Sequence, residues 1–186
     1  MLTHMLDERR WLRLLEESDA EELYAVVDAN RAYLAQWMPW AEKDDLEKVR
    51  DFIRSSRQIA DNGEFSLAIV DDDRIVGTVG FHRVDRANRS TSIGYWIAEG
   101  AQGRGTVTLA VSALLDYAFG AWNLNRIEIR AGAGNARSRA IPERLGFTQE
   151  GVRRQAERVG DRWVDHAVYA ILASEWAQRS DRSSTP

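Results

Sequence analysis

Apolar positions in the middle of the chain repeat with two different periods. Residues 92–97, SIGYWI, carry an apolar side chain at every second position, which is typical of a half-buried strand. From residue 107 to 118, apolar side chains recur three or four positions apart, which predicts an amphipathic helix. Gly120 stands where a left-handed residue would end that helix. A strand, a glycine-containing loop and a long helix are therefore predicted in succession.

The same two periods predict the remaining elements. The predicted helices span residues 18–30, 44–62, 107–120 and 135–146, and the predicted strands span residues 11–15, 64–70, 74–84, 92–97, 125–131, 147–159 and 163–172. Ser18 and Glu21 have the spacing of a capping box, and either Asp44 or Asp45 can cap the second helix. Gly160-Asp161 is a hairpin turn between the last two strands.

The order of these elements is β-α-α-β-β-β-α-β-α-β-β. Three strands follow one another through short turns, which implies an antiparallel meander. We therefore predict an α+β fold with one mixed, mostly antiparallel central sheet of about seven strands flanked by helices. At 186 residues, of which 44% are hydrophobic, residues 1–178 are predicted to form a single domain. The polar residues 179–186 are predicted to be a disordered tail.

Composition excludes several classes of protein. The chain has no cysteine, so disulfides, thiolate zinc sites and a cysteine nucleophile are excluded, and its three scattered histidines form no metal-ligand pattern. A net charge of −4 argues against binding of nucleic acid through bulk electrostatics. The N-terminal sequence MLTHMLDERR lacks the order of a signal peptide, and no apolar run is long enough to span a membrane. A cytoplasmic protein with no membrane partner is expected.

The loop QGRGT, residues 102–106, is the first candidate for chemistry. It leads into a helix N-terminus, where unpaired amides and the helix dipole favour an anion. Gly103 and Gly105 remove side chains that would keep a ligand away from the backbone, and Arg104 adds a positive charge. The loop therefore suggests a bound phosphate group. A tight turn that needs glycines for its own geometry explains the same residues.

Two nucleotide-binding motifs are absent. A Walker loop requires G-x-x-x-x-G-K-[ST], which occurs nowhere in the chain. A Rossmann fingerprint fails at the other candidate, Gly132-Ala133-Gly134, because Arg137 occupies the place of the third glycine.

The spacing of Gln102, Gly105 and Val107 resembles the pyrophosphate loop of the GNAT acetyltransferases, Q/R-x-x-G-x-G/A, although Val107 is larger than the usual last residue. The resemblance implies that the loop amides bind the diphosphate of acetyl-CoA, and that the strand around Ile97 pairs its backbone with the pantetheine arm. It also implies that the strand before the loop and the strand after the central helix splay apart to admit acyl-CoA. The implied cofactor-binding residues are Ile97, Gln102, Gly103, Arg104, Gly105, Thr106, Val107 and Asn135.

Residues 135–147, NARSRAIPERLGF, restrict the resemblance to one branch of that family. They look like the N-x-x-S…L-G-F segment of RimJ/RimL-type ribosomal protein N-terminal acetyltransferases, notably the ribosomal protein serine acetyltransferase branch. Further matches are WMPW at residues 37–40, IGYWI at 93–97, LNR at 124–126 and VDH at 164–166. These matches extend over most of the chain between residues 33 and 176. A homodimer through the last strands is implied by resemblance alone.

The resemblance also implies catalytic roles. Many GNAT enzymes have a tyrosine acid where this chain has Pro142, so its task must move to another residue. The matching serine of the RimL type is Ser138, close to the CoA sulfur, and the matching base is Glu157. Asn135 would bind the pantetheine arm.

Each of these residues also has a purely structural interpretation. Asn135 is a good N-cap, Ser138 can be an ordinary first-turn serine, and Glu157 can belong to a solvated charge ladder with neighbouring arginines. Trp37 and Trp40 either cover a substrate cleft or cover the edge of the core. His82 and His166 are expected to be structural hydrogen-bonding residues.

The sequence therefore predicts an acetyl-CoA-dependent N-acetyltransferase without a metal, acting by direct transfer in a ternary complex. The expected acceptor is the N-terminal α-amine of a protein, as in ribosomal protein acetylation, because its pKa of about 8 demands less of a base than lysine at about 10.4. The alternatives are a small amine acceptor, such as an antibiotic, polyamine or aminoacyl nucleotide, and a catalytically silent acyl-CoA-binding module.

Overall fold

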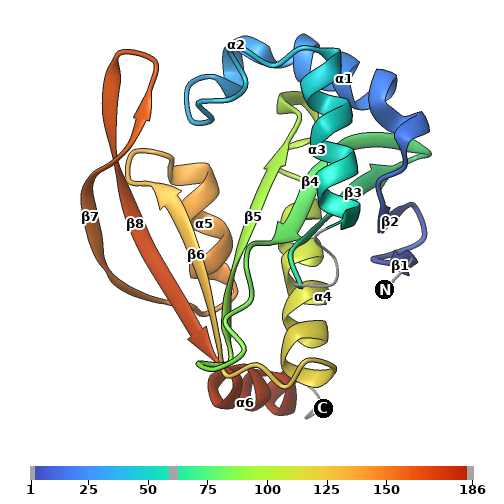
Figure 1. Cartoon of the computed structure of the whole chain (residues 1–186). Coiled ribbons are helices and arrows are strands. Elements are labelled where there is room, and N and C mark those ends of the chain that lie inside the picture. The colour runs from blue at the N-terminus through green and yellow to red at the C-terminus, as the bar shows by residue number, and fades with distance from the viewer. Residues whose placement is uncertain (1–2, 59–62, 184–186) are drawn as a thin grey trace.

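A computed structural model describes residues 3–58 and 63–183, in which eight strands form one mixed sheet. The strand order is β1-β2-β3-β4-β5-β6-β8-β7 (Figure 1). The strands are β1 (Thr3–Met5), β2 (Arg10–Leu14), β3 (Phe65–Asp71), β4 (Arg74–Phe81), β5 (Ser90–Ile97), β6 (Arg126–Gly132), β7 (Thr148–Val159) and β8 (Arg162–Leu172). The helices are α1 (Ala20–Ala29), α2 (Arg31–Leu34), α3 (Leu46–Gln58), α4 (Thr106–Gly120), α5 (Ala136–Arg144) and α6 (Ala173–Ser183).

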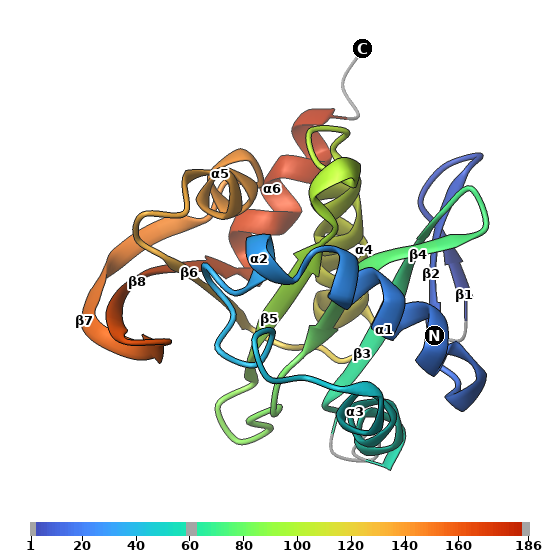
Figure 2. The same cartoon turned by 90° about the horizontal axis from the view of Figure 1, so that it is seen from above.

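Helices cover both faces of this sheet. Helices α1 and α3 lie on one face, and α4 and α6 lie on the other (Figure 2). The central helix α4 buries its apolar stripe, which includes Val111, Leu114 and Leu115, against strands from both halves of the sheet. Burial of each such side chain contributes about 1.5–3 kcal/mol, so this helix anchors the larger core. A smaller cluster packs α1 and α3 against the other face through residues such as Leu23 and Ile53.

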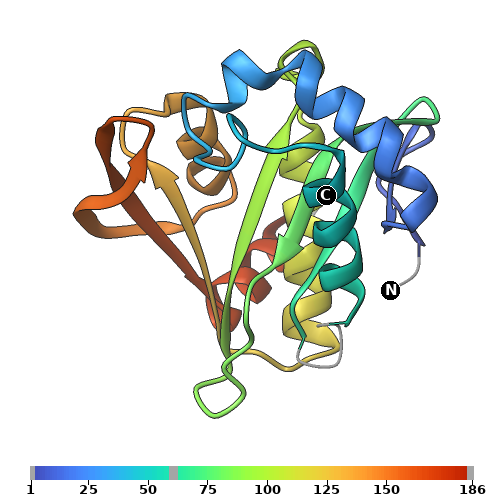
Figure 3. The same cartoon turned by 45° about the horizontal axis from the view of Figure 1, so that its top comes forward.

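The parallel strands β5 and β6 separate soon after they meet. Over the described residues they pair at only three positions, from Ser90 with Arg126 to Ser92 with Glu128. Beyond Ser92, β5 continues to Ile97 paired with β4 alone, and its other edge faces the widening gap (Figure 3). The predicted α+β architecture and the splay between these two strands are confirmed.

Several local predictions need correction. The short strand β1, paired with β2, was not predicted, so the sheet has eight strands rather than about seven. Asp19, not Ser18, closes the turn before α1, because its Oδ2 accepts from the backbone N–H of Glu16 at 2.7 Å. Gly120 is the last residue of α4 and is not left-handed; the positive φ that follows this helix, 51°, belongs to Asn123.

Other boundaries agree with the sequence. Asp45 caps α3, since its Oδ1 accepts from the N–H of Lys48 at 2.9 Å. The predicted end of that helix at residue 62 lies outside the described residues. Gly160 has a φ of +58° in the β7–β8 turn, as expected for a hairpin.

The C-terminal tail differs from the prediction in part. Residues 179–183 continue α6 as helix, whereas the sequence predicted disorder from residue 179; residues 184–186 lie outside the described part. The helix is anchored by Trp176, whose indole N–H donates to Asp116 Oδ1 of α4 at 2.7 Å. Among the described helices, none is both long and apolar enough to cross a membrane.

Candidate active site

The glycine loop between β5 and α4 has the backbone conformation that only glycine adopts easily. Gly103 and Gly105 have φ of +76° and +74°, and a Cβ added at either position would have no atom within 4 Å. The glycines therefore serve the turn, and the space in front of them is open to a ligand. Gly105 is the N-cap of α4 and supplies no side-chain hydrogen bond, so the first amides of the helix remain available to an anion.

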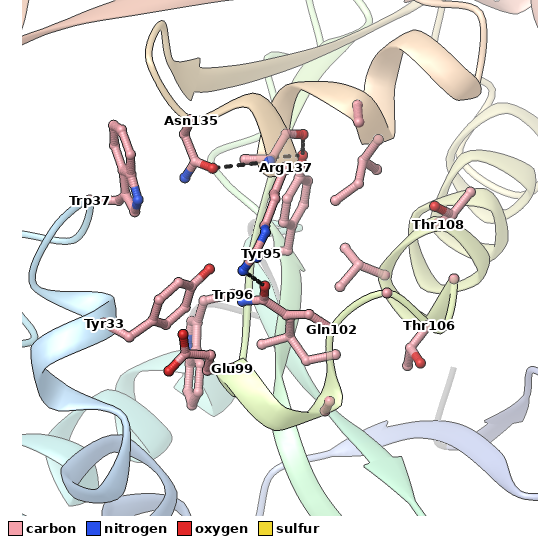
Figure 4. A pocket seen from close by; sticks show the side chains of 18 of the residues that line it. Tyr33, Trp37, Tyr95, Trp96, Glu99, Gln102, Thr106, Thr108, Asn135 and Arg137 are labelled. Carbon is pink, nitrogen blue, oxygen red and sulfur yellow. Dashed lines mark hydrogen bonds between the residues drawn. The ribbon is translucent and has the colours of Figure 1, made fainter.

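This loop forms one wall of a cavity of about 990 Å³. The predicted cofactor-binding residues that line it are Ile97, Gln102, Gly103, Gly105, Thr106, Val107 and Asn135, and Ser138 joins them (Figure 4). Arg104 is not among the residues that line this cavity. Its guanidinium lies 3.5 Å from the buried carboxylate of Asp71 and donates to the carbonyl of Gly100.

The loop is held from behind by a residue that the sequence analysis missed. Arg10 of β2 donates to the carbonyl of Arg104 at 2.8 Å and to Oγ1 of Thr106 at 2.9 Å. Arg10 is itself fixed by Asp7, and its hydrogen bond to that carboxylate, together with backbone N–H groups, lowers the pKa of Asp7 to about 2. The Thr106 side chain is buried and serves as an anchor, which leaves its backbone N–H for binding.

Helix α5 forms the opposite wall. Asn135 caps it, with Oδ1 accepting from the N–H of Ser138 at 3.1 Å, so the structural interpretation of Asn135 is confirmed and its Nδ2 remains for a ligand. Arg137 donates to Oε1 of Gln102 at 2.8 Å, and Arg144 donates to Oγ1 of Thr108 at 2.8 Å. Both arginines line the cavity and contact neutral partners, so their charges are available to an anionic ligand. In Figure 4, Arg137 reaches across the cavity to Gln102.

Tyr95 of β5 contacts α5 at the inner end of this cavity. Its hydroxyl donates to the carbonyl of Ser138 at 2.9 Å and lies 3.4 Å from Ser138 Oγ. Burial raises the pKa of Tyr95, so the phenol is neutral at any ordinary pH.

A second cavity, of about 1,090 Å³, lies on the other side of the splay. It contains Glu157, whose Oε2 lies 3.2 Å from Nε2 of His166, and it also contains His82. Both histidines, which the sequence analysis set aside as structural, therefore lie in a candidate site. Trp40 lines this cavity against Trp96, with ring centroids 5.9 Å apart.

Glu157 reaches this cavity because β7 is irregular. The register with β8 shifts between Arg153 and Glu157, and Gln155 has a φ of +49°. Such a bulge turns the following side chains, and Glu157 is half-buried in the cavity while Arg154 and Arg158 on either side are exposed. The interpretation of Glu157 as a member of a solvated charge ladder does not fit this placement.

The two cavities share part of their lining and therefore adjoin each other. The shared residues are Trp37, Met38, Tyr95, Trp96, Asn135 and Ser138. Trp37 covers this junction: a Cβ on Gly132 would lie 2.8 Å from its ring, and the guanidinium of Arg162 lies 5.3 Å from its centroid. This position favours the interpretation of Trp37 as part of a cleft roof. Two ligands that enter from opposite sides would meet beside Ser138.

The charged groups around the second cavity have both signs. The charged side chains that line it are Asp44, Lys48, Asp51, Glu64, Arg130, Arg153 and Glu157. Burial raises the pKa of Asp44. Among the residues that the structure describes, no group of three His, Cys, Asp or Glu side chains is placed to hold a metal ion.

Known proteins are similar to this chain over most of its length. A model of the acetyltransferase (GNAT) domain family matches residues 9–148. The putative ribosomal N-acetyltransferase YdaF of Bacillus subtilis is 37% identical over 179 residues, which cover 95% of this chain and 98% of that protein.

Two solved structures are similar over nearly their full length. RimL, a ribosomal L7/L12 alpha-N-protein acetyltransferase in complex with coenzyme A, superposes with a TM-score of 0.87 at 26% identity, covering 91% of this chain and 97% of that one. The microcin C7 self-immunity acetyltransferase MccE, in complex with acetyl-CoA and AMP, has a TM-score of 0.84 at 29% identity, covering 90% and 94%.

Proposed function

The chain belongs to the GNAT family of acetyl-CoA-dependent N-acetyltransferases, and from this premise we propose that it acetylates the N-terminal α-amine of a ribosomal protein. The observation that carries this proposal is the shared wall of the two cavities, which allows a donor and an acceptor to be bound together at Ser138. The acceptor class is supported by relatives named as ribosomal N-acetyltransferases. An α-amine also suits a site in which one carboxylate, Glu157, is the proposed base, because more of an α-amine than of a lysine side chain is unprotonated near neutral pH.

The first cavity fits acetyl-CoA. The amides of residues 102–107 bind the diphosphate, and the free edge of β5 near Ile97 pairs with the pantetheine amides. The Nδ2 group of Asn135, left over from the N-cap, donates to a pantetheine carbonyl. Arg137 and Arg144 supply the positive charge that Arg104 does not, because the phosphates of CoA are anions and these two guanidinium groups have neutral partners.

The second cavity binds the acceptor amine and holds the base. The amine nitrogen attacks the thioester carbonyl carbon, the C–N bond forms, and the C–S bond breaks to release CoA as a thiolate. Ser138 Oγ–H donates a hydrogen bond to the departing sulfur, and Glu157 takes the excess proton of the amine, directly or through a water molecule. His166 holds Glu157 in place. Direct transfer requires no covalent enzyme intermediate, because both substrates are positioned together.

A small amine is the second candidate acceptor. Trp37, Trp40 and Trp96 all line the second cavity, and aromatic rings of this kind stack on flat ligands. The similar structure of MccE contains AMP as well as acetyl-CoA. These two observations favour an aminoacyl nucleotide among the small amines.

The experiment is a measurement of CoA release from acetyl-CoA with a panel of acceptors. The panel holds peptides that begin with Ser, Ala or Met, peptides with a blocked N-terminus and a free lysine, polyamines, aminoglycosides and an aminoacyl sulfamoyl adenosine. Turnover confined to free peptide N-termini is the expected result. Turnover on a small amine alone would overturn the proposed acceptor, and acetyl-CoA binding without turnover on any amine would indicate a silent acyl-CoA-binding module.

A further inference from the structure

Helix α5 contains a proline that leaves one of its carbonyl groups without its helical donor. Pro142 lies inside the helix and is buried. In a regular helix the N–H of residue 142 would donate to the carbonyl of residue 138, and proline has no N–H to give. The missing bond therefore falls on Ser138, the residue that stands where the two cavities meet.

The hydroxyl of Tyr95 takes the place of that donor. It comes from β5, 43 residues earlier in the chain, and donates to the Ser138 carbonyl at 2.9 Å. The same hydroxyl oxygen lies 3.4 Å from Ser138 Oγ, so Tyr95 contacts both polar groups of this serine. A buried carbonyl without a donor is costly, which explains why a tyrosine is placed at this point.

We infer that Tyr95 and Pro142 act together to position Ser138. Pro142 frees the carbonyl, and Tyr95 uses it to attach the first turn of α5 to β5, the strand that leads directly into the cofactor loop. Ser138 is thereby fixed relative to the diphosphate-binding amides across a gap that β5 and β6 do not bridge. The inference rests on the proposed role of Ser138 in assisting departure of the thiolate.

Tyr95 is a positioning residue and not the acid of the reaction. Its proton is engaged with the Ser138 carbonyl, and its hydroxyl oxygen faces the serine side chain. It faces the hydroxyl of Ser138, and the titratable group that acts on it is the phenol of Tyr169. Its effect on the rate is therefore expected to be independent of pH between about 6 and 9.

A double-mutant cycle tests this inference. Tyr95→Phe is expected to lower kcat about tenfold on the best acceptor of the panel, with KM for acetyl-CoA changed less than about twofold. Pro142→Ala supplies a helical amide that competes with the Tyr95 hydroxyl for the Ser138 carbonyl, so it should lower kcat toward that of Tyr95→Phe. In the Pro142→Ala background, Tyr95→Phe should then cost less than about twofold, because the bond between α5 and β5 is already weakened.

The same double-mutant cycle, measured by thermal or denaturant unfolding, tests the hydrogen bond from Tyr95 to the Ser138 carbonyl in the absence of an amine substrate. The destabilisation caused by Tyr95→Phe should also shrink when Pro142 is replaced by Ala. Equal losses from Tyr95→Phe in both backgrounds, in kcat and in stability, would overturn the inference.

Tyr169→Phe is the matched control. The hydroxyl of Tyr169 is also buried and also holds α5, since it donates to Glu143 Oε1 at 2.7 Å and accepts from Arg139 Nε at 2.8 Å. It should lower stability without the selective loss in kcat, and its effect should be the same in the parent and in the Pro142→Ala background. Ser138→Ala in the same assay distinguishes the proposed role of Ser138 in the reaction from the positioning role of Tyr95. Unchanged kcat in that variant would refute the role of Ser138, whereas a loss in kcat with an additive cycle would refute the positioning role alone.

Discussion

The two cavities differ in how the chain builds them. The first cavity, proposed for acetyl-CoA and called the cofactor cavity below, takes one wall from a single stretch, residues 97–107, and its proposed binding groups are backbone amides beside two left-handed glycines. The second cavity, proposed for the acceptor and called the acceptor cavity below, is lined by residues of α1, α3, α5, β3, β4, β5, β6, β7 and β8 and of the α2–α3 connection. A site made of backbone leaves a spacing of glycines in the sequence, whereas a site made of distant side chains leaves no local pattern. The chemistry of the donor is therefore readable from this chain, and the identity of the acceptor is not.

The largest expected effect is a loss of kcat caused by a change in the acceptor cavity, with no change in the affinity for acetyl-CoA. Glu157→Gln should lower kcat about a hundredfold at every pH, because the amine loses its proton acceptor, while the affinity for acetyl-CoA stays unchanged. A pH-rate profile and calorimetric titration with acetyl-CoA measure the two quantities. Glu150→Gln is the control, since Glu150 lies on the same strand but is exposed and paired with Arg126. Full activity of Glu157→Gln would show that Glu157 is not the base.

The next effect is confined to the cofactor side. Arg137→Gln should weaken acetyl-CoA binding about tenfold and leave binding of acetyl-pantetheine, which lacks the nucleotide phosphates, unchanged. Arg104→Gln should change either affinity less than about twofold, because its guanidinium is paired with Asp71. Calorimetry with both donors gives the comparison. If the Arg104 variant lost more affinity than the Arg137 variant, the assignment of the phosphate-binding charge would be wrong.

A smaller effect belongs to the acceptor alone. Trp40→Ala should raise KM for the best acceptor about fivefold without changing the dissociation constant of acetyl-CoA, since Trp40 lines only the second cavity. Steady-state kinetics at saturating acetyl-CoA measure it, with Trp163→Ala as a control because Trp163 is 59% exposed. An equal rise in the acetyl-CoA dissociation constant would show that the cavities are not separate.

The smallest effect should touch neither cavity. Burial opposes ionisation of Asp19, but its hydrogen bonds from Arg13 and from the N–H of Glu16 outweigh it and lower its pKa. The ionised carboxylate therefore stabilises the fold above its unfolded pKa of about 3.9, and this contribution is lost as pH falls through the lower folded value. Asp19→Asn should reduce the free energy of unfolding by about 1–2 kcal/mol at pH 7 and by less near pH 2. Denaturant unfolding at the two pH values measures the difference, and a constant penalty would contradict it.

The sequence predicted the elements with a strong local signal. The alternation of β5 and the helical period of α4 were read correctly, and Asn135 was placed correctly at the start of α5. The strand β1 was missed because its three residues carry no period and are defined by pairing with β2. The end of α4 at Gly120 was predicted correctly, but Gly120 is not the left-handed residue, because the positive φ after this helix belongs to Asn123.

The residues of the candidate site also fall into two groups, those with a local sequence signal and those defined by contacts with distant residues. The loop was proposed from its glycine spacing and Ser138 from the family resemblance, and both line the first cavity, but Arg10, Tyr95 and Arg137 were not assigned to the site. Each contacts a partner that is 35 or more residues away, so no local pattern could reveal it. Arg104 differs from these residues: its position in the loop suggested a phosphate contact, and its side chain is paired with a distant carboxylate, Asp71 of β3.

The central claim is that donor and acceptor occupy the two cavities at the same time and react directly. Initial rates measured while acetyl-CoA and the best acceptor of the panel are both varied test it most directly. The account predicts double-reciprocal lines that intersect, as for a ternary complex, and no acetylated enzyme in the mass spectrum after incubation with acetyl-CoA alone. Parallel lines, together with an acetyl group on the enzyme, would contradict it.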